Sequence, residues 1–184
     1  VGVKIDYKSY FHLAGKSTLK GTKTIVDLWI KHPDWPTLTL IQCKENAPKY
    51  VPDNVRLITK YLTTDELKKE MNQHGVHLCT SQSEGWGHYI VEAMSCGALV
   101  VTTDAPPMNE IITPDRGMLV PFESKESRHL GAKFNVNPIA LSNLINKIIL
   151  MTDSEKMEYG HVARDWYKKN RSHFTESLPM VIQS

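Results

Sequence analysis

Apolar residues in this chain fall into short, nearly continuous runs that alternate with segments of helical periodicity. Such runs are typical of parallel strands covered on both faces, because a half-exposed strand alternates apolar and polar side chains. The pattern predicts six strands, at residues 11–14, 38–43, 55–58, 76–80, 99–102 and 118–120. The polar stretch 123–136 predicts a loop or a small hairpin.

Helices are predicted between these runs by apolar spacing and by capping residues. Thr22, Ile25, Val26, Trp29 and Ile30 form one stripe with three- and four-residue steps. Further helices are expected from the cap Thr63 to about Asn72, over 87–96 with Gly97 at the end, after Asn137-Pro138, and over about 154–170 behind the capping-box sequence 152–155.

The alternation of strand and helix predicts an α/β fold, a doubly wound, Rossmann-like parallel sheet in a single domain over residues 1–184. Ligands of such folds bind in the crevice at the carboxyl ends of the strands. The loops to search for a site are therefore 15–21, 43–54, 59–64, 80–88 and 103–110.

Composition narrows the classes of partner. The chain has 41% hydrophobic and 23% charged residues and a formal net charge of +2, with its lysines and arginines scattered. Nucleic-acid binders carry a concentrated basic face, so we expect no nucleic acid as a partner. No apolar run approaches the roughly 20 residues of a membrane-spanning helix, so we expect no transmembrane segment.

Three cysteines, Cys43, Cys79 and Cys96, are an odd number without close pairing. They predict free thiols in a reducing compartment, and Cys43 and Cys79 are expected to be buried because they lie in strand-like runs. We therefore expect a cytoplasmic protein and leave a peripheral association with membranes open. The printed chain starts at Val1 rather than Met, so it does not report on targeting segments of a longer parent protein.

The loop after the fourth predicted strand carries the strongest chemical signal, the sequence EGWGHYIVE at 84–92. Gly85 and Gly87 let the backbone approach a ligand closely, and the free N–H groups at the start of the next helix suit a diphosphate. Glu92 can accept two hydrogen bonds from a ribose diol, and Glu84 lies near the group attached to the diphosphate. An isolated pair of this kind is more often a surface carboxylate beside a turn. Its place between a glycine-rich loop and a buried strand favours a site.

Residues 84–103, EGWGHYIVEAMSCGALVVTT, resemble the E-x7-E block of the group 1 glycosyltransferases, a retaining family with the GT-B fold. The resemblance implies that the chain is the C-terminal, nucleotide-sugar-binding half of that fold and that Glu92 binds the donor ribose. It also implies a pocket for the donor sugar and diphosphate, lined by Glu84, Gly85, Trp86, Gly87 and His88. The family often has proline where Tyr89 stands.

A second loop agrees with this resemblance. The segment Gly15-Lys16-Ser17-Thr18-Leu19-Lys20-Gly21 follows the first predicted strand. Its lysines can neutralise a leaving diphosphate, although solvated loop lysines are the more frequent case. The segment lacks the Gly-Lys-Ser/Thr order of a P-loop, but it resembles the family's G-[RK]-x-x-x-K-G phosphate loop. The resemblance implies donor contacts from Gly15, Lys16, Ser17 and Lys20, with Lys20 and Glu84 acting at the reacting group.

Three further residues leave alternatives open. Tyr61 follows the third predicted strand, where similar proteins hold the nucleobase, and it can either stack on a base or pack against the next helix. His88 is either a donor contact or an exposed residue at a helix start. Glu110 also matches a family position, but a structural role is the more frequent one for such a residue.

Two other signals point away from a site. Gly85-x-Gly87 has Ile90 at the place of the third glycine of a dinucleotide fingerprint, and it follows the fourth strand rather than the first, so NAD is not expected. His74 and His77 flank a strand start without cysteine or acidic partners, so we expect no metal site there.

The resemblance implies transfer of a sugar from a UDP- or GDP-linked donor to an unidentified acceptor, with retention of configuration and without a metal or other cofactor. It further implies an N-terminal acceptor domain in the same parent protein. That domain is missing from the printed chain, which we expect to bind nucleotide and to be incomplete for catalysis. The alternative is a non-catalytic nucleotide- or nucleotide-sugar-binding module of the same fold. A sugar-phosphate phosphorylase shares the architecture but needs a phosphate site between two domains.

Overall fold

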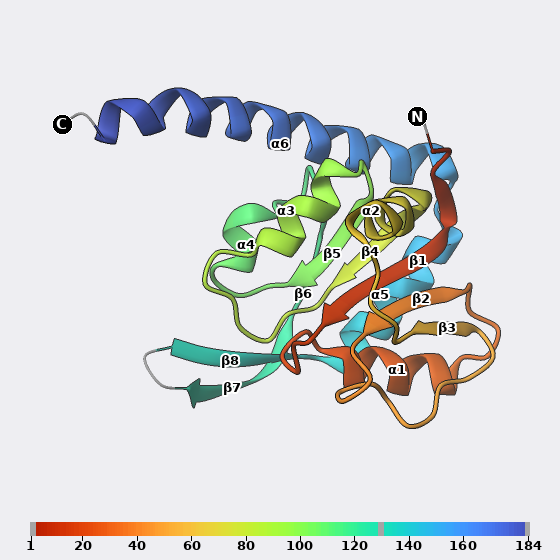
Figure 1. Ribbon diagram of the computed structural model, residues 1–184. Coiled ribbons are helices and arrows are strands. Elements are labelled where there is room, and N and C mark those ends of the chain that lie inside the picture. Colours follow the sequence, from red (N-terminus) through yellow and green to blue (C-terminus); the bar gives the residue numbers. More distant parts are fainter. Residues whose placement is uncertain (1–2, 129–130, 183–184) are drawn as a thin grey trace.

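Six parallel strands form the centre of the computed structural model, which describes residues 3–128 and 131–182 (Figure 1). The strands are β1 (Asp6–Gly15), β2 (Leu38–Gln42), β3 (Val55–Ile58), β4 (His74–Cys79), β5 (Leu99–Thr103) and β6 (Met118–Val120). Their order in the sheet is β3-β2-β1-β4-β5-β6, and every neighbouring pair is parallel. This is the doubly wound, Rossmann-like sheet that the hydrophobic pattern predicts.

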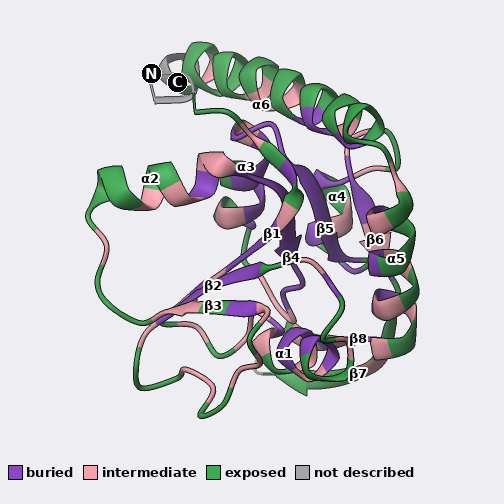
Figure 2. Ribbon diagram, turned by 90° about the vertical axis from the view of Figure 1, so that its right-hand side faces the viewer, coloured by how far each residue is buried: buried purple, intermediate pink, exposed green. Residues whose placement is uncertain are grey.

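Helices cover both faces of the sheet. On one face α1 (Thr22–Lys31) and α5 (Pro138–Leu150) pack in a cluster with the strands. On the other face lie α2 (Thr64–Gln73), α3 (His88–Ser95), the short α4 (Met108–Ile111) and α6 (Asp153–Ile182). Every residue of β2, β4 and β5 is buried as a result, which accounts for their continuous apolar runs. Figure 2 shows these buried strands between the two helical layers.

The capping residues act as predicted. Thr63 and Glu66 form a reciprocal capping box at the start of α2, and the side chain of Asn137 accepts a hydrogen bond from the Ala140 N–H at the start of α5. Gly97 follows α3 with a φ of 74°, the left-handed conformation that glycine adopts most easily. Local sequence therefore sets where these helices begin and end.

Two elements extend beyond their predicted bounds. Strand β1 begins at Asp6 rather than Phe11, since Asp6 already pairs with His74 of β4, and the register of this pairing shifts between Asp6 and Tyr10. Helix α6 continues to Ile182 rather than ending near Asn170. No glycine or proline between Asn170 and Ser177 interrupts the helix there.

Of the two alternatives for residues 123–136, the hairpin is correct. Strands β7 (Phe122–Arg128) and β8 (Gly131–Val136) pair antiparallel and project from the end of β6 (Figure 1). The Phe134 N–H donates to the Gln82 carbonyl at 2.7 Å, and the Gln82 side-chain amide donates to Asn135 Oδ1 at 2.7 Å. The hairpin is thus anchored to the loop that follows β4.

The three cysteines are free thiols. Cys79 and Cys96 are buried, but Cys43 is half-buried, so its predicted burial is wrong. The reason is that β2 ends one residue earlier, at Gln42, and Cys43 starts the loop at the carboxyl edge of the sheet.

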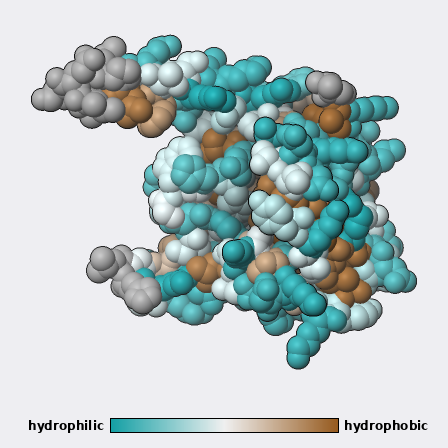
Figure 3. All heavy atoms as spheres, viewed as in Figure 1, coloured by the Kyte–Doolittle hydropathy of each residue, from teal (hydrophilic) through white to brown (hydrophobic). Residues whose placement is uncertain are grey.

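Figure 3 shows that the molecular surface is recessed between the outer part of α6 and the hairpin, on the side toward which the strands point. Within the part of the chain that the structure describes, none of the helices combines the length and the apolar character that crossing a membrane requires.

Candidate functional site

The order of the sheet reverses between β1 and β4. Strands β1, β2 and β3 follow one another in one direction, and β4, β5 and β6 follow in the other. The loops after β1 and β4 therefore leave neighbouring strands and diverge to helices on opposite faces. This is the topological switch point at which open α/β sheets bind ligands.

The two loops at the switch point are in direct contact. The Gln82 N–H donates to the Leu19 carbonyl at 2.8 Å, and the Thr80 hydroxyl donates to the Lys20 carbonyl at 3.2 Å. Gly21 has a φ of 75°, and a side chain there would collide with the backbone and side chain of Thr80. Glycine is thus required for the loops to approach so closely.

This contact brings together the two residues that the resemblance places at the reacting group. The Lys20 ammonium forms an ion pair with Glu84 Oε1, although the residues are 64 positions apart in the chain. Their side chains are 17% and 13% exposed, so the pair is largely buried where the two loops meet. A small part of both the cation and the carboxylate remains exposed to solvent.

Two residues that the sequence analysis did not identify support this pair. Ser81 Oγ lies 2.5 Å from Glu84 Oε1 and 2.7 Å from the Tyr89 hydroxyl, and the Lys20 ammonium lies 3.8 Å from the centre of the Tyr89 ring. Tyr89 carries an available signal, since it stands where the family often has proline. Ser81 has no signal of its own in the sequence, because its role depends on a contact that only the fold creates.

His12, near the end of β1, supports the loop from beneath. It is fully buried, with Nδ1 2.7 Å from the Leu78 carbonyl and Nε2 2.9 Å from the Thr22 hydroxyl. Burial lowers the pKa of His12 to about 4. The neutral ring therefore donates from Nδ1 to the carbonyl and accepts at Nε2 from Thr22. Because Thr22 is the first residue of α1, this bond fixes the point where the loop ends.

A pocket of about 410 Å³ opens at the ends of β1, β2 and β3, beside the loop at residues 15–21, which we call the lysine loop. Three of the predicted donor residues, Gly15, Lys16 and Tyr61, line it together. Tyr61 is 92% exposed, so the packing of its ring against the next helix is excluded and the stacking alternative remains. Ser17 has a local function, since its hydroxyl accepts a hydrogen bond from the Leu19 N–H at 3.1 Å and shapes the loop.

A second hollow, of about 580 Å³, lies on the other side of the switch point between the start of α3 and α6. Trp86, His88 and the exposed Glu92 line it, together with α6 residues that include Tyr167 and Arg171. The rings of Trp86 and His88 lie 5.0 Å apart. Six of the predicted donor residues thus line two separate hollows, three in each, while the Lys20–Glu84 pair lies at the switch point and lines neither.

The glycines of the second loop have different surroundings. Gly87 precedes α3 with a φ of 98°, and a side chain there would meet Ile111 Cδ1 at 2.8 Å. Gly85 is exposed, and a Cβ added to it would meet nothing within 4 Å. Only Gly87 is required by the fold, and Gly85 leaves space open in front of the helix.

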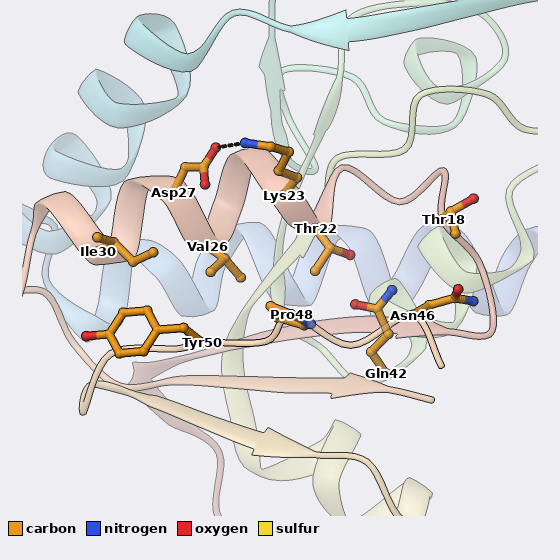
Figure 4. Close-up of a pocket in the computed structure, with 10 residues that line it drawn as sticks. All are labelled: Thr18, Thr22, Lys23, Val26, Asp27, Ile30, Gln42, Asn46, Pro48 and Tyr50. Carbon is orange, nitrogen blue, oxygen red and sulfur yellow. Dashed lines mark hydrogen bonds and ion pairs between the residues drawn. The ribbon is translucent and has the colours of Figure 1, made fainter. Parts of the chain in front are cut away.

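A third groove, of about 300 Å³, lies apart from these residues, between α1 and the loop at 43–54 (Figure 4). Val26, Ile30 and Tyr50 line one end, and Gln42 and Asn46 the other. Gln42 donates to the Ser17 carbonyl at 3.3 Å, and Asn46 donates to the Lys16 carbonyl at 2.9 Å. The polar end of this groove thus supports the backbone of the lysine loop.

The remaining predicted residues are not brought into the site. Glu110 is exposed on α4. His74 lies 2.9 Å from the Ser9 hydroxyl and, contrary to expectation, has an acidic neighbour, since Glu70 is one helical turn earlier and 3.6 Å away. His77 lies 3.0 Å from the Met71 carbonyl. Among residues 3–128 and 131–182, no group of three or more His, Cys, Asp or Glu side chains is placed to hold a metal ion.

The doubly wound sheet with a charged pair at its switch point defines a Rossmann-like ligand-binding domain. The family model "Glycosyl transferases group 1" matches residues 42–166, and the chain belongs to this family. The matched residues begin after Lys16 and Lys20, so the family model does not include the lysine loop. The connection between this loop and the E-x7-E block is the ion pair between Lys20 and Glu84. No curated protein is similar enough in sequence to count as a match.

Solved structures show the same fold at low sequence identity. HepE of Anabaena, in complex with UDP-glucose, is 19% identical with a TM-score of 0.70, and the match covers 94% of this chain and 49% of HepE. Sucrose-phosphate synthase of Thermosynechococcus elongatus is 18% identical with a TM-score of 0.73, covering 96% of this chain and 45% of that one. The chain thus spans about half the length of these proteins.

A third match is to a shorter chain. The C-terminal domain of a glycosyl transferase group 1 family protein, LpcC of Francisella tularensis, is 19% identical with a TM-score of 0.63. Here the match covers 91% of this chain and 87% of the other. At this level of identity the similarity establishes the fold: the chain has the architecture of one Rossmann-like half of GT-B glycosyltransferases.

Proposed function

We propose that this domain binds a UDP- or GDP-linked sugar and forms the donor half of a retaining glycosyltransferase. The observation that carries the proposal is the Lys20–Glu84 pair at the switch point, directly before the start of α3. A cation next to the free N–H groups of a helix start stabilises the charge that develops on a departing diphosphate. Membership of the group 1 family and the fold shared with UDP-glucose-bound HepE support the same class of ligand.

The proposed donor spans the switch point between the two hollows. Tyr61 stacks on the base in the first hollow, while Gly15, Lys16 and Ser17 hold the phosphates with Lys20. Gly85, Trp86, Gly87 and His88 surround the sugar together with Glu84, and of these Trp86 and His88 line the second hollow. Glu92 accepts hydrogen bonds from the ribose hydroxyls. Binding energy from base and ribose then positions the reacting carbon.

The proposed reaction needs no metal or other cofactor, because lysine and helix-end amides supply the positive charge on the diphosphate. The acceptor would be bound by an N-terminal domain of the parent protein, facing the carboxyl edge of the sheet. Addition of EDTA is expected to leave both nucleotide affinity and transfer by the parent protein unchanged. A loss of either that Mg²⁺ restores would contradict the metal-free mechanism.

The first test is nucleotide binding by the chain itself. A ligand that binds the native state raises its stability by mass action, so a thermal-shift screen with UDP, GDP and ADP is expected to identify UDP or GDP. Glu92→Ala is then expected to lower the affinity for that nucleotide about 10- to 100-fold, as measured by calorimetry, because two charge-assisted hydrogen bonds to the ribose are lost. Glu158→Ala, which removes an exposed carboxylate from α6, serves as the matched control.

Unchanged affinity in Glu92→Ala would overturn the ribose assignment. The alternative function is a non-catalytic binding module of the same fold. Experiments on the parent protein distinguish this alternative from a transferase. Nucleotide binding without sugar transfer to any acceptor, or the absence of a second α/β domain upstream, would favour the module.

A further inference from the structure

Tyr89 lies in the first turn of α3, contacts Lys20 of the Lys20–Glu84 pair directly and is linked to Glu84 through Ser81. Its ring lies beneath the Lys20 ammonium, 3.8 Å from ring centre to Nζ, and its hydroxyl lies 2.7 Å from Ser81 Oγ. Ser81 Oγ in turn lies 2.5 Å from Glu84 Oε1. One side chain therefore connects to the cation through its ring and to the carboxylate through its hydroxyl.

The hydrogen bonds of this cluster have a defined direction. Burial raises the pKa of Tyr89 well above its usual value, so the phenol keeps its proton and donates to Ser81 Oγ. The Ser81 hydroxyl hydrogen is then available to Glu84 Oε1, which also receives the Lys20 ammonium. Both donors converge on the same carboxylate oxygen, which holds the carboxylate in one orientation.

The ring restricts where the ammonium can lie. A lysine side chain is a flexible four-carbon stem that loses considerable rotamer freedom when its head is fixed. Here Glu84 takes one N–H donor, and the face of Tyr89 attracts the cation from another side. The ammonium is thus held in place before a ligand arrives, and within the described part of the chain its other N–H donors have no hydrogen-bond partner and can serve a phosphate.

We infer that Tyr89 is a positioning residue, which holds Lys20 and Glu84 in the arrangement that receives the donor diphosphate. The inference rests on the proposed function, since it presumes that Lys20 binds a phosphate. Tyr89 acts through its neighbours: the ring orders the cation and the hydroxyl, through Ser81, orders the carboxylate. Proline at this position would supply neither contact.

The experiment compares UDP with UMP, or GDP with GMP if the guanine nucleotide binds better, by calorimetry. Tyr89→Leu removes both the ring and the hydroxyl. It is expected to lower the affinity for the nucleoside diphosphate about 10-fold and the affinity for the monophosphate less than about 2-fold, because only the second phosphate depends on an ordered Lys20. Tyr89→Phe keeps the ring, and it is expected to stay within about 3-fold of the wild type for both.

A double-mutant cycle isolates the contact. In the background of Lys20→Met, Tyr89→Leu is expected to have no further effect on the ratio of diphosphate to monophosphate affinity. The ratio is the informative quantity, because general damage to the fold weakens both nucleotides alike. Circular dichroism confirms that each variant is folded.

The outcomes separate the two proposals. If the wild type binds the diphosphate and Tyr89→Leu binds it equally well, the positioning role is wrong and the proposed function stands. If Tyr89→Leu weakens both nucleotides by the same factor, or acts equally without Lys20, Tyr89 is only structural. If the wild type binds neither UDP nor GDP, the proposed function fails and the inference fails with it.

Discussion

Two clusters of polar groups, one at each edge of the parallel sheet, differ in the kind of partner they have. At the amino edge, the Tyr7 hydroxyl donates to the Gly97 carbonyl at 2.8 Å, and the buried Lys156 ammonium donates to the Tyr7 carbonyl at 3.1 Å. Gly160 of α6 packs directly against the Gly97 backbone. The partners in this cluster are backbone atoms, which cannot move away unless the chain itself moves.

In the cluster around Lys20 and Glu84 at the carboxyl edge, by contrast, the partners are side chains. Lys20, Glu84, Ser81 and Tyr89 contact one another through groups at the ends of rotatable bonds. Such contacts can be exchanged for a ligand without displacing a strand. The comparison indicates that bonds to the backbone at the amino edge and in the core stabilise the fold, while the side-chain contacts around Lys20 and Glu84 can rearrange without moving the backbone.

The largest effect on stability is expected from acidification, because two buried histidines, His12 and His77, are hydrogen-bonded to backbone carbonyls. His12 and His77 are buried neutral beside the carbonyls of Leu78 and Met71, and burial lowers the pKa of each to about 4 from an ordinary value of 6.5. Between these values the unfolded chain binds protons that the folded chain does not. The stabilisation is therefore complete above pH 6.5 and is lost as the pH falls toward 4.

Denaturant unfolding measured from pH 7 to pH 5 is expected to show a loss on the order of 3 kcal/mol for the two sites together. His77→Gln keeps a side-chain N–H for the Met71 carbonyl but does not titrate, so its pH slope is expected to fall by about half. His173→Gln, an exposed residue, is the control and retains the full slope. A slope in His77→Gln equal to the wild type would contradict the assignment.

Next in size is the contact between glycines at the amino edge. A Cβ added to Gly160 would overlap the carbonyl of Gly97, and that backbone cannot turn aside as a side chain can. We expect Gly160→Ala to destabilise the protein by about 2 kcal/mol even though alanine favours the helix by about 1 kcal/mol. Nucleotide affinity of the folded variant should remain that of the wild type. Thermal unfolding and calorimetry measure the two quantities separately.

The fold could be predicted from the sequence because its main features are local or periodic. The buried runs of β4 and β5 reflect coverage on both faces, and the caps Thr63 and Asn137 need only residues three positions away. The predicted end of α6 near Asn170 is too early, because no glycine or proline between Asn170 and Ser177 stops the helix there.

The site could be predicted only in part, because its components depend on contacts between distant segments. Glu84 and Lys20 were each identified from loop position and resemblance, but their ion pair joins residues 64 positions apart and follows from the sheet order. Ser81 and His12 were missed because neither belongs to a motif. Their roles exist only where the fold brings them to Glu84 and Thr22.

The smallest expected change in stability is at Gly85, a glycine at the carboxyl edge that can be compared with Gly160 at the amino edge. A Cβ there would meet nothing within 4 Å, so Gly85→Ala is expected to change the free energy of unfolding by less than about 0.5 kcal/mol. The same methyl group would occupy the open space in front of α3, where the donor is proposed to lie. Nucleotide-sugar affinity is therefore expected to fall although stability does not, the reverse of Gly160→Ala. If Gly85→Ala and Gly160→Ala both lost stability and kept nucleotide-sugar affinity, the two edges would not differ in function. Gly85 would then belong to an ordinary surface turn.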